Sequence, residues 1–303
     1  MDHLKGIILI VTGSMLWGAT GPLTEWLLQN TEMSVNFLLT VRLLIAGVGI
    51  LLFLQIANKS IFNIWKSKYW IIQLVIYSII GMLGIQYSFT TTIHKSNAVF
   101  ATLLQFLGPI FIVGFTSLKL KQWPPRYQII GILGTFVGLF LLLTNLKFNQ
   151  LLVSNEAIVW GFILGITFAF YTLYPVRLMA EWGVLLVVGW SMFIGGILLG
   201  TGSVIWQSED WSLLVDWKIC LLLASLIFFS TIAFVMFLSS MKYISPVLTS
   251  VLSTVEPLTA MVISFIVFST SFGGWQLVGI FFMLICVTWI SVASEKAEKY
   301  KKS

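Results

Sequence analysis

Apolar segments of roughly membrane-spanning length follow one another along the whole chain of 303 residues. A helix that crosses the hydrocarbon core of a bilayer needs about 20 predominantly apolar residues. With that window we predict ten transmembrane helices, at residues 5–28, 34–56, 70–92, 96–118, 126–145, 156–178, 183–206, 217–241, 245–268 and 273–294. The expected fold class is therefore an all-α integral membrane protein.

Charged residues make up only 9% of the chain, and hydrophobic residues make up 58%. Soluble domains carry about 25% charged residues, so a surface this poor in charge needs lipid as its solvent. The net charge of +6 does not indicate nucleic-acid binding, because the basic residues lie in the connections and the C-terminal tail. Cys220 and Cys286 lie inside apolar segments, which argues against a disulfide framework.

Motifs of catalysis are missing from the sequence. We find no Walker pattern, no dinucleotide-binding glycine fingerprint and no His-Glu-x-x-His, so neither a nucleotide-driven pump nor a membrane metalloprotease is supported. His3 and His94 are the only histidines, which weakens any hypothesis of nucleophilic catalysis. We predict no catalytic residues, no metal site and no cofactor.

The basic residues are distributed unevenly between the two sides of the predicted bundle. Thirteen of the 17 Lys and Arg residues lie on the side that both termini share, and three lie on the other side. Cytoplasmic connections are enriched in Lys and Arg, so we predict a plasma-membrane protein with both termini in the cytoplasm. The basic tail, residues 295–303, is interpreted as the flank that fixes this topology, with binding to anionic lipid headgroups as the alternative.

The two halves of the chain resemble each other. A shift of 148 residues places Pro109 on Pro257 and the Gln-x-x-Gly pattern of 128–131 on that of 276–279. The first helix of each half aligns at a shift of 153, which places Pro22 on Pro175. The predicted division is a five-helix repeat at 1–145, an external connection at 146–155, a second five-helix repeat at 156–294 and a cytoplasmic tail at 295–303.

Each repeat has an odd number of predicted helices, so the second repeat must enter the membrane from the side opposite to the first. Inverted repeats of this kind are associated with secondary transporters whose substrate site lies near the middle of the bilayer.

Several motifs resemble the drug/metabolite transporter superfamily, in particular its EamA-type members. They are Trp17-Gly18, the run Leu39–Ala46 around Arg42, Gly108-Pro109, Glu256-Pro257 and the Gln-x-x-Gly pattern that opens the fifth and tenth helices. The resemblance covers nearly the whole chain. It implies a ten-helix transporter of small organic metabolites, often an exporter, with a cavity between the halves. Where members commonly carry a loop Glu, this chain has Gln122 and Thr270, so no role is assigned to that carboxylate.

The ninth predicted helix carries the residues least suited to a bilayer. Ser245, Thr249, Ser253 and Glu256 follow one another at helical spacing on one face, which is expected to point into the bundle or a wet cavity. Glu256 is the only acidic residue predicted near the middle of the bilayer. It is interpreted either as a site for a proton, a cation or a substrate amine, or as a protonated structural residue that hydrogen-bonds a neighbouring helix.

Prolines interrupt the helices at matching places. Pro257 lacks an amide hydrogen and is predicted to free the carbonyl of Ser253, and Pro109 is predicted to do the same for Gln105. A freed carbonyl near the middle of the bilayer can bind a substrate donor, an ion or a water. Pro22 and Pro175 are candidates for hinges or for simple kinks.

Further residues are candidates for a substrate cavity: Trp17, Gln86, Tyr87, Gln105, Tyr171 and Tyr174. Ordinary helix packing is the alternative for each aromatic residue. Arg42 is the one basic residue in a helix centre. It is expected to bind a substrate carboxylate, to pair with Glu25 or Glu256, or to have a structural role near the outer mouth. His94 lies at an outer helix end, where a solvated histidine is the usual case.

Together these features predict a secondary transporter of small organic metabolites that works by alternating access. Export of amino acids or related compounds is the preferred reading, driven by a proton gradient through Glu256 or by the solute's own gradient. Uptake of a nutrient is the alternative within transport, because the fold does not set direction. The rival from another class is a non-transport membrane protein, such as a sensor or an assembly scaffold.

Overall fold

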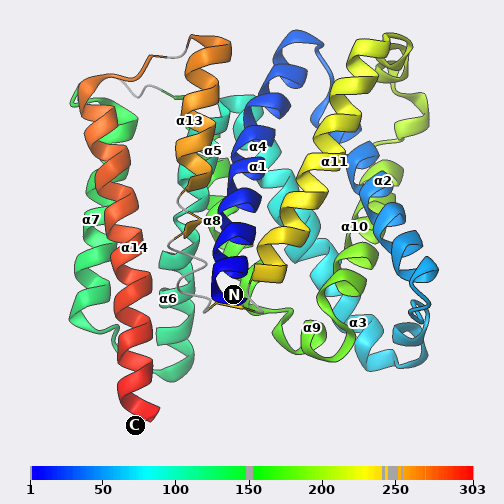
Figure 1. Ribbon diagram of the computed structural model, residues 1–303. Helices are drawn as coiled ribbons and strands as arrows, with labels where there is room; N and C mark the ends of the chain where they lie inside the picture. Colours follow the sequence, from blue (N-terminus) through cyan, green and yellow to red (C-terminus); the bar gives the residue numbers. More distant parts are fainter. Residues whose placement is uncertain are drawn as a thin grey trace.

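The computed structural model describes residues 2–147, 153–240, 243–244, 252–253, 255–269 and 271–302, and these residues form helices and their connections. The α-helices are α1 (Asp2–Asn30), α2 (Val35–Ile56), α3 (Lys68–Ile76), α4 (Gly84–Lys95), α5 (Ala98–Gln105), α6 (Gly108–Leu120), α7 (Arg126–Thr144), α8 (Asn155–Leu173), α9 (Val176–Trp182), α10 (Val184–Gly202), α11 (Trp217–Ser240), α13 (Val255–Phe268) and α14 (Gly274–Lys302). Between them lie the 3-10 helices η1 (Asn63–Lys66), η3 (Ile205–Gln207) and η4 (Glu209–Val215) and the π-helix η2 (Tyr77–Leu83). The helices stand side by side, and α1 begins and α14 ends toward the same, lower side of the bundle (Figure 1).

Eight helical segments are long and apolar enough to cross a membrane. They are His3–Asn30, Val35–Ile56, Lys68–Lys95, Ala98–Lys119, Arg126–Thr144, Asn155–Leu173, Val184–Gly202 and Trp217–Phe237. Two shorter apolar helices, Val255–Phe268 and Gly274–Ile290, occupy the places of the ninth and tenth predicted spans, and part of the ninth lies outside the described residues. The all-α membrane class is confirmed for the described chain, whereas the number of ten spans stays a prediction.

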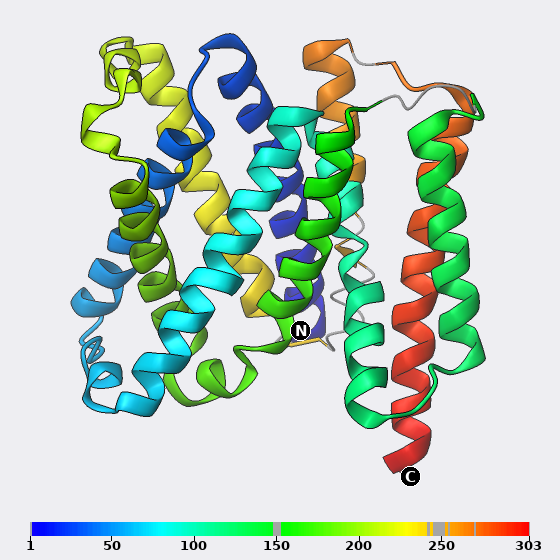
Figure 2. The same ribbon diagram turned by 180° about the vertical axis from the view of Figure 1, so that it is seen from behind.

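Helices far apart in the sequence pack against each other in pairs. The most extensive pairs are α7 with α14, α2 with α10, α1 with α11 and α13, and α4 with α8. The views from the two sides agree that α7 and α14 form one edge of the bundle (Figures 1 and 2). These pairs join helices from distant parts of the sequence into one bundle.

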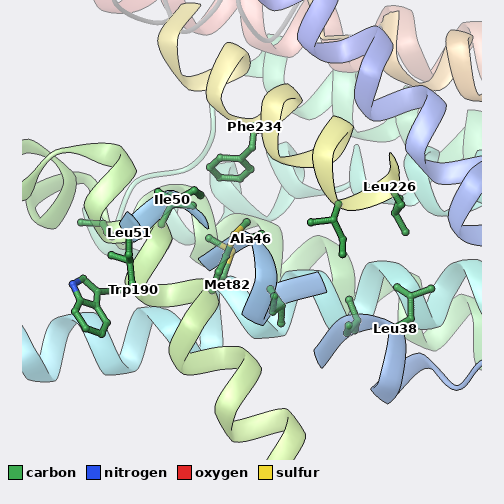
Figure 3. Close-up of a cluster of buried hydrophobic side chains, with 14 of the residues drawn as sticks. Leu38, Ala46, Ile50, Leu51, Met82, Trp190, Leu226 and Phe234 are labelled. Carbon is green, nitrogen blue, oxygen red and sulfur yellow. The ribbon is translucent and has the colours of Figure 1, made fainter. Parts of the chain in front are cut away.

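The largest cluster of buried hydrophobic side chains joins α2, α10, α11 and η2. Figure 3 shows part of this cluster, with Ala46 of α2 and Met82 of η2 below Phe234 of α11. The indole N–H of Trp190, on α10, donates to the carbonyl of Ile61 at 2.9 Å, which satisfies the one polar atom that this large side chain buries. A second cluster lies between α5, α7, α13 and α14 and includes Leu103, Leu139 and Met283.

The third predicted helix is not a regular α-helix, because residues Tyr77 to Leu83 form a π-helix between α3 and α4. The ring of Tyr77 is fully buried and lies back over Gly81, where an added Cβ would come within 2.6 Å of the ring. Only a glycine at position 81 leaves room for this ring. Single π-helical turns inside α-helices are frequent at functional sites.

Pro109, Pro175 and Pro22 lie at different places relative to the helices. The fourth predicted helix divides into α5, which ends at Gln105, and α6, which begins at Gly108, with Pro109 in the first turn of α6, where a missing N–H costs nothing. Pro175 lies between α8 and α9. Pro22, in contrast, lies inside α1, which continues unbroken to Asn30, so the proposed hinge at Pro22 is at most a kink.

A glycine contact between α7 and α14 yields the first testable prediction. A Cβ added at Gly138 would lie 2.8 Å from the carbonyl oxygen of Gly279, and backbone atoms cannot move aside as a side chain can. Gly138→Ala is expected to lower the free energy of unfolding by about 1–3 kcal/mol through overpacking. Thermal unfolding in detergent measures the effect.

The matched control for that substitution is Gly114→Ala on α6. An added Cβ at Gly114 would meet no atom within 4 Å, so this change is expected to be neutral or slightly stabilising. Equal stability of the two variants would contradict the close approach of α7 and α14.

Candidate functional site

Aromatic side chains from four helices meet in the interior of the bundle. Trp17 of α1 packs edge to face on Phe234 of α11, with ring centroids 5.6 Å apart, and Tyr171 of α8 packs edge to face on the same Phe234 at 6.1 Å. Tyr171 in turn stacks on Tyr77 of the π-helix at 5.9 Å. The four rings, called here the aromatic cluster, therefore link segments from both halves of the chain.

The polar atoms of this region are poorly satisfied by the protein itself. Tyr77 is fully buried, and its hydroxyl faces that of Tyr171 but makes no hydrogen bond of ordinary geometry within the described part of the chain. The hydroxyls of Thr90 and Thr91 on the neighbouring α4 are likewise buried without a partner among those residues. A buried polar group without a partner costs about 1–3 kcal/mol and calls for an explanation. A polar solute in contact with such groups would provide one.

Glu256 lies in the first turn of α13, where a negative charge is stabilised by the helix dipole. The residue is 5% exposed, and no hydrogen bond or ion pair of its carboxylate is recorded within the described residues. Its backbone N–H donates to the carbonyl of Ser253 at 2.9 Å. The expectation that Pro257 leaves the carbonyl of Ser253 free is therefore wrong. Pro257 removes only the amide donor four residues after Ser253, and the N–H of Glu256, three residues after it, donates instead. Ser245 and Thr249, expected on the same face, lie outside the described residues.

Helix α1 reaches the backbone of Glu256 directly. A Cβ added at Gly18 would overlap the carbonyl oxygen of Glu256 and would come within 2.8 Å of the Cβ of Thr259. Pro22, one turn further along α1, has no N–H to donate to the carbonyl of Gly18. The predicted motif Trp17-Gly18 thus has two roles, because Trp17 joins the aromatic cluster while Gly18 allows α1 to pack on the beginning of α13.

The two helix breaks lie at equivalent positions of the two halves. At the shift of 148, Gly108 corresponds to Glu256, and these residues lie in the first turns of α6 and α13. Figure 1 shows α6 in the lower part of the bundle and α13 in the upper part, so that both begin between the two faces. Gln105 ends α5 just before the first break and is half-buried. Both helix N-termini, with their partial positive charge, therefore lie in the interior.

Other predicted cavity residues lie apart from the aromatic cluster. Tyr87 of α4 packs on Trp160 of α8 at 5.6 Å and borders an open groove of about 430 Å³ between α4, η2, α2 and α10. Gln86, beside it on α4, is half-buried. Tyr174 stacks on Phe170 at 4.6 Å, at the end of α8. Their predicted contact with substrate stays a prediction.

Arg42 is buried, with 8% of its surface exposed, and the structure records no ion pair or hydrogen bond of its side chain within the described residues. The expected pairing of Arg42 with Glu25 is wrong. Glu25 instead accepts hydrogen bonds from the backbone N–H of Ala98 at 2.8 Å and from the side-chain amide of Gln29 at 3.4 Å. His94 is exposed at the end of α4.

Sequence reasoning missed Tyr77, Phe234 and Glu25 as members of the interior. A glycine four residues after Tyr77 is the one local signal for the turned ring. Phe234 had no signal, because a phenylalanine in an apolar helix looks the same whether it faces lipid or protein. Glu25 was noticed only as a partner for Arg42, since its real partner, Ala98, is 73 residues away in sequence.

The packed apolar helices, interrupted in the interior, define a multi-pass membrane protein with a polar and aromatic centre. The model of the EamA-like transporter family matches residues 4–144 and again residues 155–292. The chain therefore belongs to the EamA-like transporter family, whose members carry small molecules, and the resemblance found in the sequence is confirmed.

Two comparisons extend this assignment. A relative from Salmonella typhimurium, named "Uncharacterized inner membrane transporter YicL", is 33% identical over 293 residues, which are 96% of this chain and 97% of that protein. A solved structure described as "Crystal structure of protein" has a TM-score of 0.61 at 15% identity and covers 97% of this chain and 98% of its own. The relative is named as a membrane transporter, whereas the likeness to the solved structure is a likeness of fold.

Substitutions of Tyr77 can distinguish a role of its hydroxyl in transport from a role in packing. Tyr77→Phe keeps the ring and removes only the hydroxyl with its contact to the hydroxyl of Tyr171, so the free energy of unfolding is expected to change by no more than about 1 kcal/mol. Transport, measured in the same protein, is expected to fall if the hydroxyl faces the solute.

The control is Tyr77→Ala, which leaves a cavity and is expected to cost about 3–5 kcal/mol of stability. A stability loss in Tyr77→Phe close to that of Tyr77→Ala would show that the hydroxyl holds the fold together and would remove it from the candidate site.

Proposed function

We propose that the protein is a secondary transporter of small organic metabolites, in which two inverted five-helix halves rock about a site between them. The observation that carries this proposal is the pair of helix breaks at Gly108-Pro109 and Glu256-Pro257. They occupy equivalent positions in the two halves, and α5, which ends just before the first break, packs on α13, which begins at the second. Broken helices at a repeat interface are the usual site of substrate and ion binding in such transporters.

The helix packing supports a two-fold relation between the halves. Each predicted span of the first half has its equivalent five spans later in the chain. By this rule α2 and α10 are equivalent and pack on each other, and the same holds for α7 and α14. The contact of α1 with α11 then corresponds to that of α8 with α4, and the contact of α1 with α13 corresponds to that of α8 with α6. All of these contacts occur.

The crossing of α7 and α14 supports the same relation at single residues. At the shift of 148, Gly134 corresponds to Phe282, and a Cβ added at Gly134 would lie 3.6 Å from the ring of Phe282. The contact of Gly138 with Gly279 has as its two-fold equivalent the contact of Cys286 with Gly131, where an added Cβ would lie 3.4 Å from the Cys286 carbonyl. A residue that meets its own equivalent lies on or near the two-fold axis.

We propose ten spans, with repeats at 1–145 and 156–294, a connection at 146–155 and a tail at 295–303. The opposite run of α1 and α8 supports the inversion, since α1 rises from the lower side in Figure 1 and α8 descends from the upper side in Figure 2. The lower side, which holds the excess of Lys and Arg and both ends of the chain, is assigned to the cytoplasm.

The proposed substrate site consists of the aromatic cluster together with Glu256 and the helix breaks. Trp17 and Tyr171 offer faces for an aromatic or cationic group, and Glu256 offers a carboxylate for an amine. Ser253, Thr249, Gln105, Gln86, Tyr87 and Tyr174 are proposed as further wall residues, and Pro109, Pro175 and Pro257 as the points about which helices move. This chemistry fits amino acids and related compounds, and export is the proposed direction.

Comparison of cells with and without the protein tests the function and identifies the solute. Overproduction of an exporter is expected to lower the internal level of a small amine or aromatic metabolite severalfold and to raise its level in the medium. Accumulation inside the cells would instead establish uptake. Purified protein that is stabilised by the solute but moves none in proteoliposomes would exclude transport.

The proton role of Glu256 is tested by Glu256→Gln, which keeps the size of the side chain and removes its charge. In proteoliposomes, the wild-type protein is expected to accumulate the solute in response to an imposed pH gradient, and the variant is expected to lose this response while retaining exchange of solute for solute. Glu181→Gln, at an exposed position of α9, is the matched control and is expected to behave as wild type. An unchanged response in Glu256→Gln would leave the solute's own gradient as the driving force.

A further inference from the structure

Glu25 is a buried carboxylate that the proposed transport site does not use. It lies on α1, five residues before the helix ends at Asn30, and 4% of its surface is exposed. One carboxylate oxygen accepts the hydrogen bond from the N–H of Ala98, and Ala98 is the fully buried first residue of α5. The carboxylate thus joins α1 directly to the beginning of α5, the first segment of the broken fourth helix.

The contact between α1 and α5 extends over two turns of α1. Gly21 lies one turn before Glu25, and a Cβ added there would be 3.2 Å from the Cβ of Ala98. The first N–H groups of a helix need acceptors from outside the helix. Asn97 provides one, because its side chain accepts from the N–H of Phe100 at 2.8 Å, and Glu25 provides the next from across the interface. A charged acceptor at this end also gains from the helix dipole.

The first turn of α5 also borders a partly open cavity at this end of the bundle. A cavity of about 90 Å³ is lined by Asn97 and Phe100 of this turn, by Leu142 of α7 and by Gln276 of α14. The turn is therefore joined to α1 by the hydrogen bond to Glu25 and by the packing of Ala98 on Gly21, and it borders free space toward α7 and α14. Loss of the hydrogen bond would loosen the turn toward this cavity, against the packing of the buried side chains of Ala98, Val99 and Phe100.

The bond exists in only one of the proposed halves. At the shift of 153, Glu25 corresponds to Leu178, an apolar residue that is 2% exposed. A carboxylate that is not duplicated by the repeat gives the two faces of the molecule different contacts. The hydrogen bond between Glu25 and Ala98 lies toward the upper face in Figure 1, where α1 ends and α5 begins.

We propose that Glu25 is a proton-sensitive latch of a gate that α1 and α5 form at this face. The ionised carboxylate holds the N–H of Ala98 and keeps α5 on α1. When the carboxylate takes up a proton, the charge-assisted hydrogen bond weakens, and the first turn of α5 is released toward the cavity. Glu25 is a positioning residue that does not contact the solute. The gate itself rests on the proposed function of alternating access.

Few other charged groups lie on the elements packed against α1. They are His94 and Lys95 on α4, Lys218 on α11 and Glu256 on α13, and α5 has none. His94 is exposed, and Lys95 is engaged by Glu156 in an exposed ion pair at 2.7 Å. The hydrogen bonds of Glu25 go to Ala98 and Gln29 and to none of these groups, so its own protonation is the event that breaks the latch.

Hydrogen exchange of the full-length protein in lipid nanodiscs tests the latch and needs no solute. In the wild-type protein, exchange of the amides of residues 98–101, corrected for the intrinsic effect of pH, is expected to speed up as the pH is lowered. Glu25→Gln is expected to exchange there about tenfold faster than wild type at pH 8 and to lose the dependence on pH. Glu25→Asp is expected to restore part of that dependence. Amides of α7 and α14 serve as the internal reference and are expected to stay unchanged.

Glu32→Gln, at an exposed position just after α1, is the matched control and is expected to behave as wild type. Exchange at residues 98–101 that does not depend on pH in the wild-type protein would overturn the latch, and so would an equal rise over all helices in Glu25→Gln. The wild-type profile alone decides the matter if the variants fail to fold. A pH-dependent α5 without solute flux would retain the latch and reject transport, whereas flux with a pH-independent α5 would do the reverse.

Discussion

The constraint on which the structure depends is that no backbone polar group can be left without a partner in hydrocarbon. Regular helices satisfy it locally, but the first N–H groups of a helix need acceptors from elsewhere. At the beginning of α5, Asn97 and Glu25 provide acceptors. At the beginning of α13, the carbonyl of Ser253 accepts from Glu256. Polar groups of the interior are therefore found where helices begin, because that is where the backbone needs partners.

Close approach of helices is the second requirement, because lipid tails are as apolar as the helices and give little reason for helices to associate. Glycine residues allow this close approach at two contacts. Gly18 allows α1 to lie on the backbone of Glu256, and Gly138 and Gly279 allow α7 and α14 to cross with their backbones nearly touching. The first contact places α1 beside a break, and the second holds the edge of the bundle together.

Much of the interior could be predicted residue by residue, and the failures have physical causes. Trp17 and Tyr171 were expected inside and do meet through Phe234. Tyr77 was missed, because a regular helical pattern does not show that a π-helix begins at this residue or that its ring lies over Gly81. The carbonyl of Ser253 was expected to be free, but loss of one donor to proline left another donor within reach. Arg42 lacks the expected partner, because Glu25 had a backbone N–H to bind.

The sequence by itself determined the membrane class, the family, the places of the prolines and the equivalence of the two halves. These features depend on the number, type and spacing of residues along one chain, which hydrophobic length, charge and repetition make visible. The tertiary structure alone decided that Tyr77 and Phe234 complete the aromatic cluster, that Gly18 faces Glu256 and that Glu25 binds Ala98. Each of these contacts joins residues from different helices, and the rotation of a helix about its own axis, which selects the contacting face, is set by packing against neighbours that the local sequence does not specify.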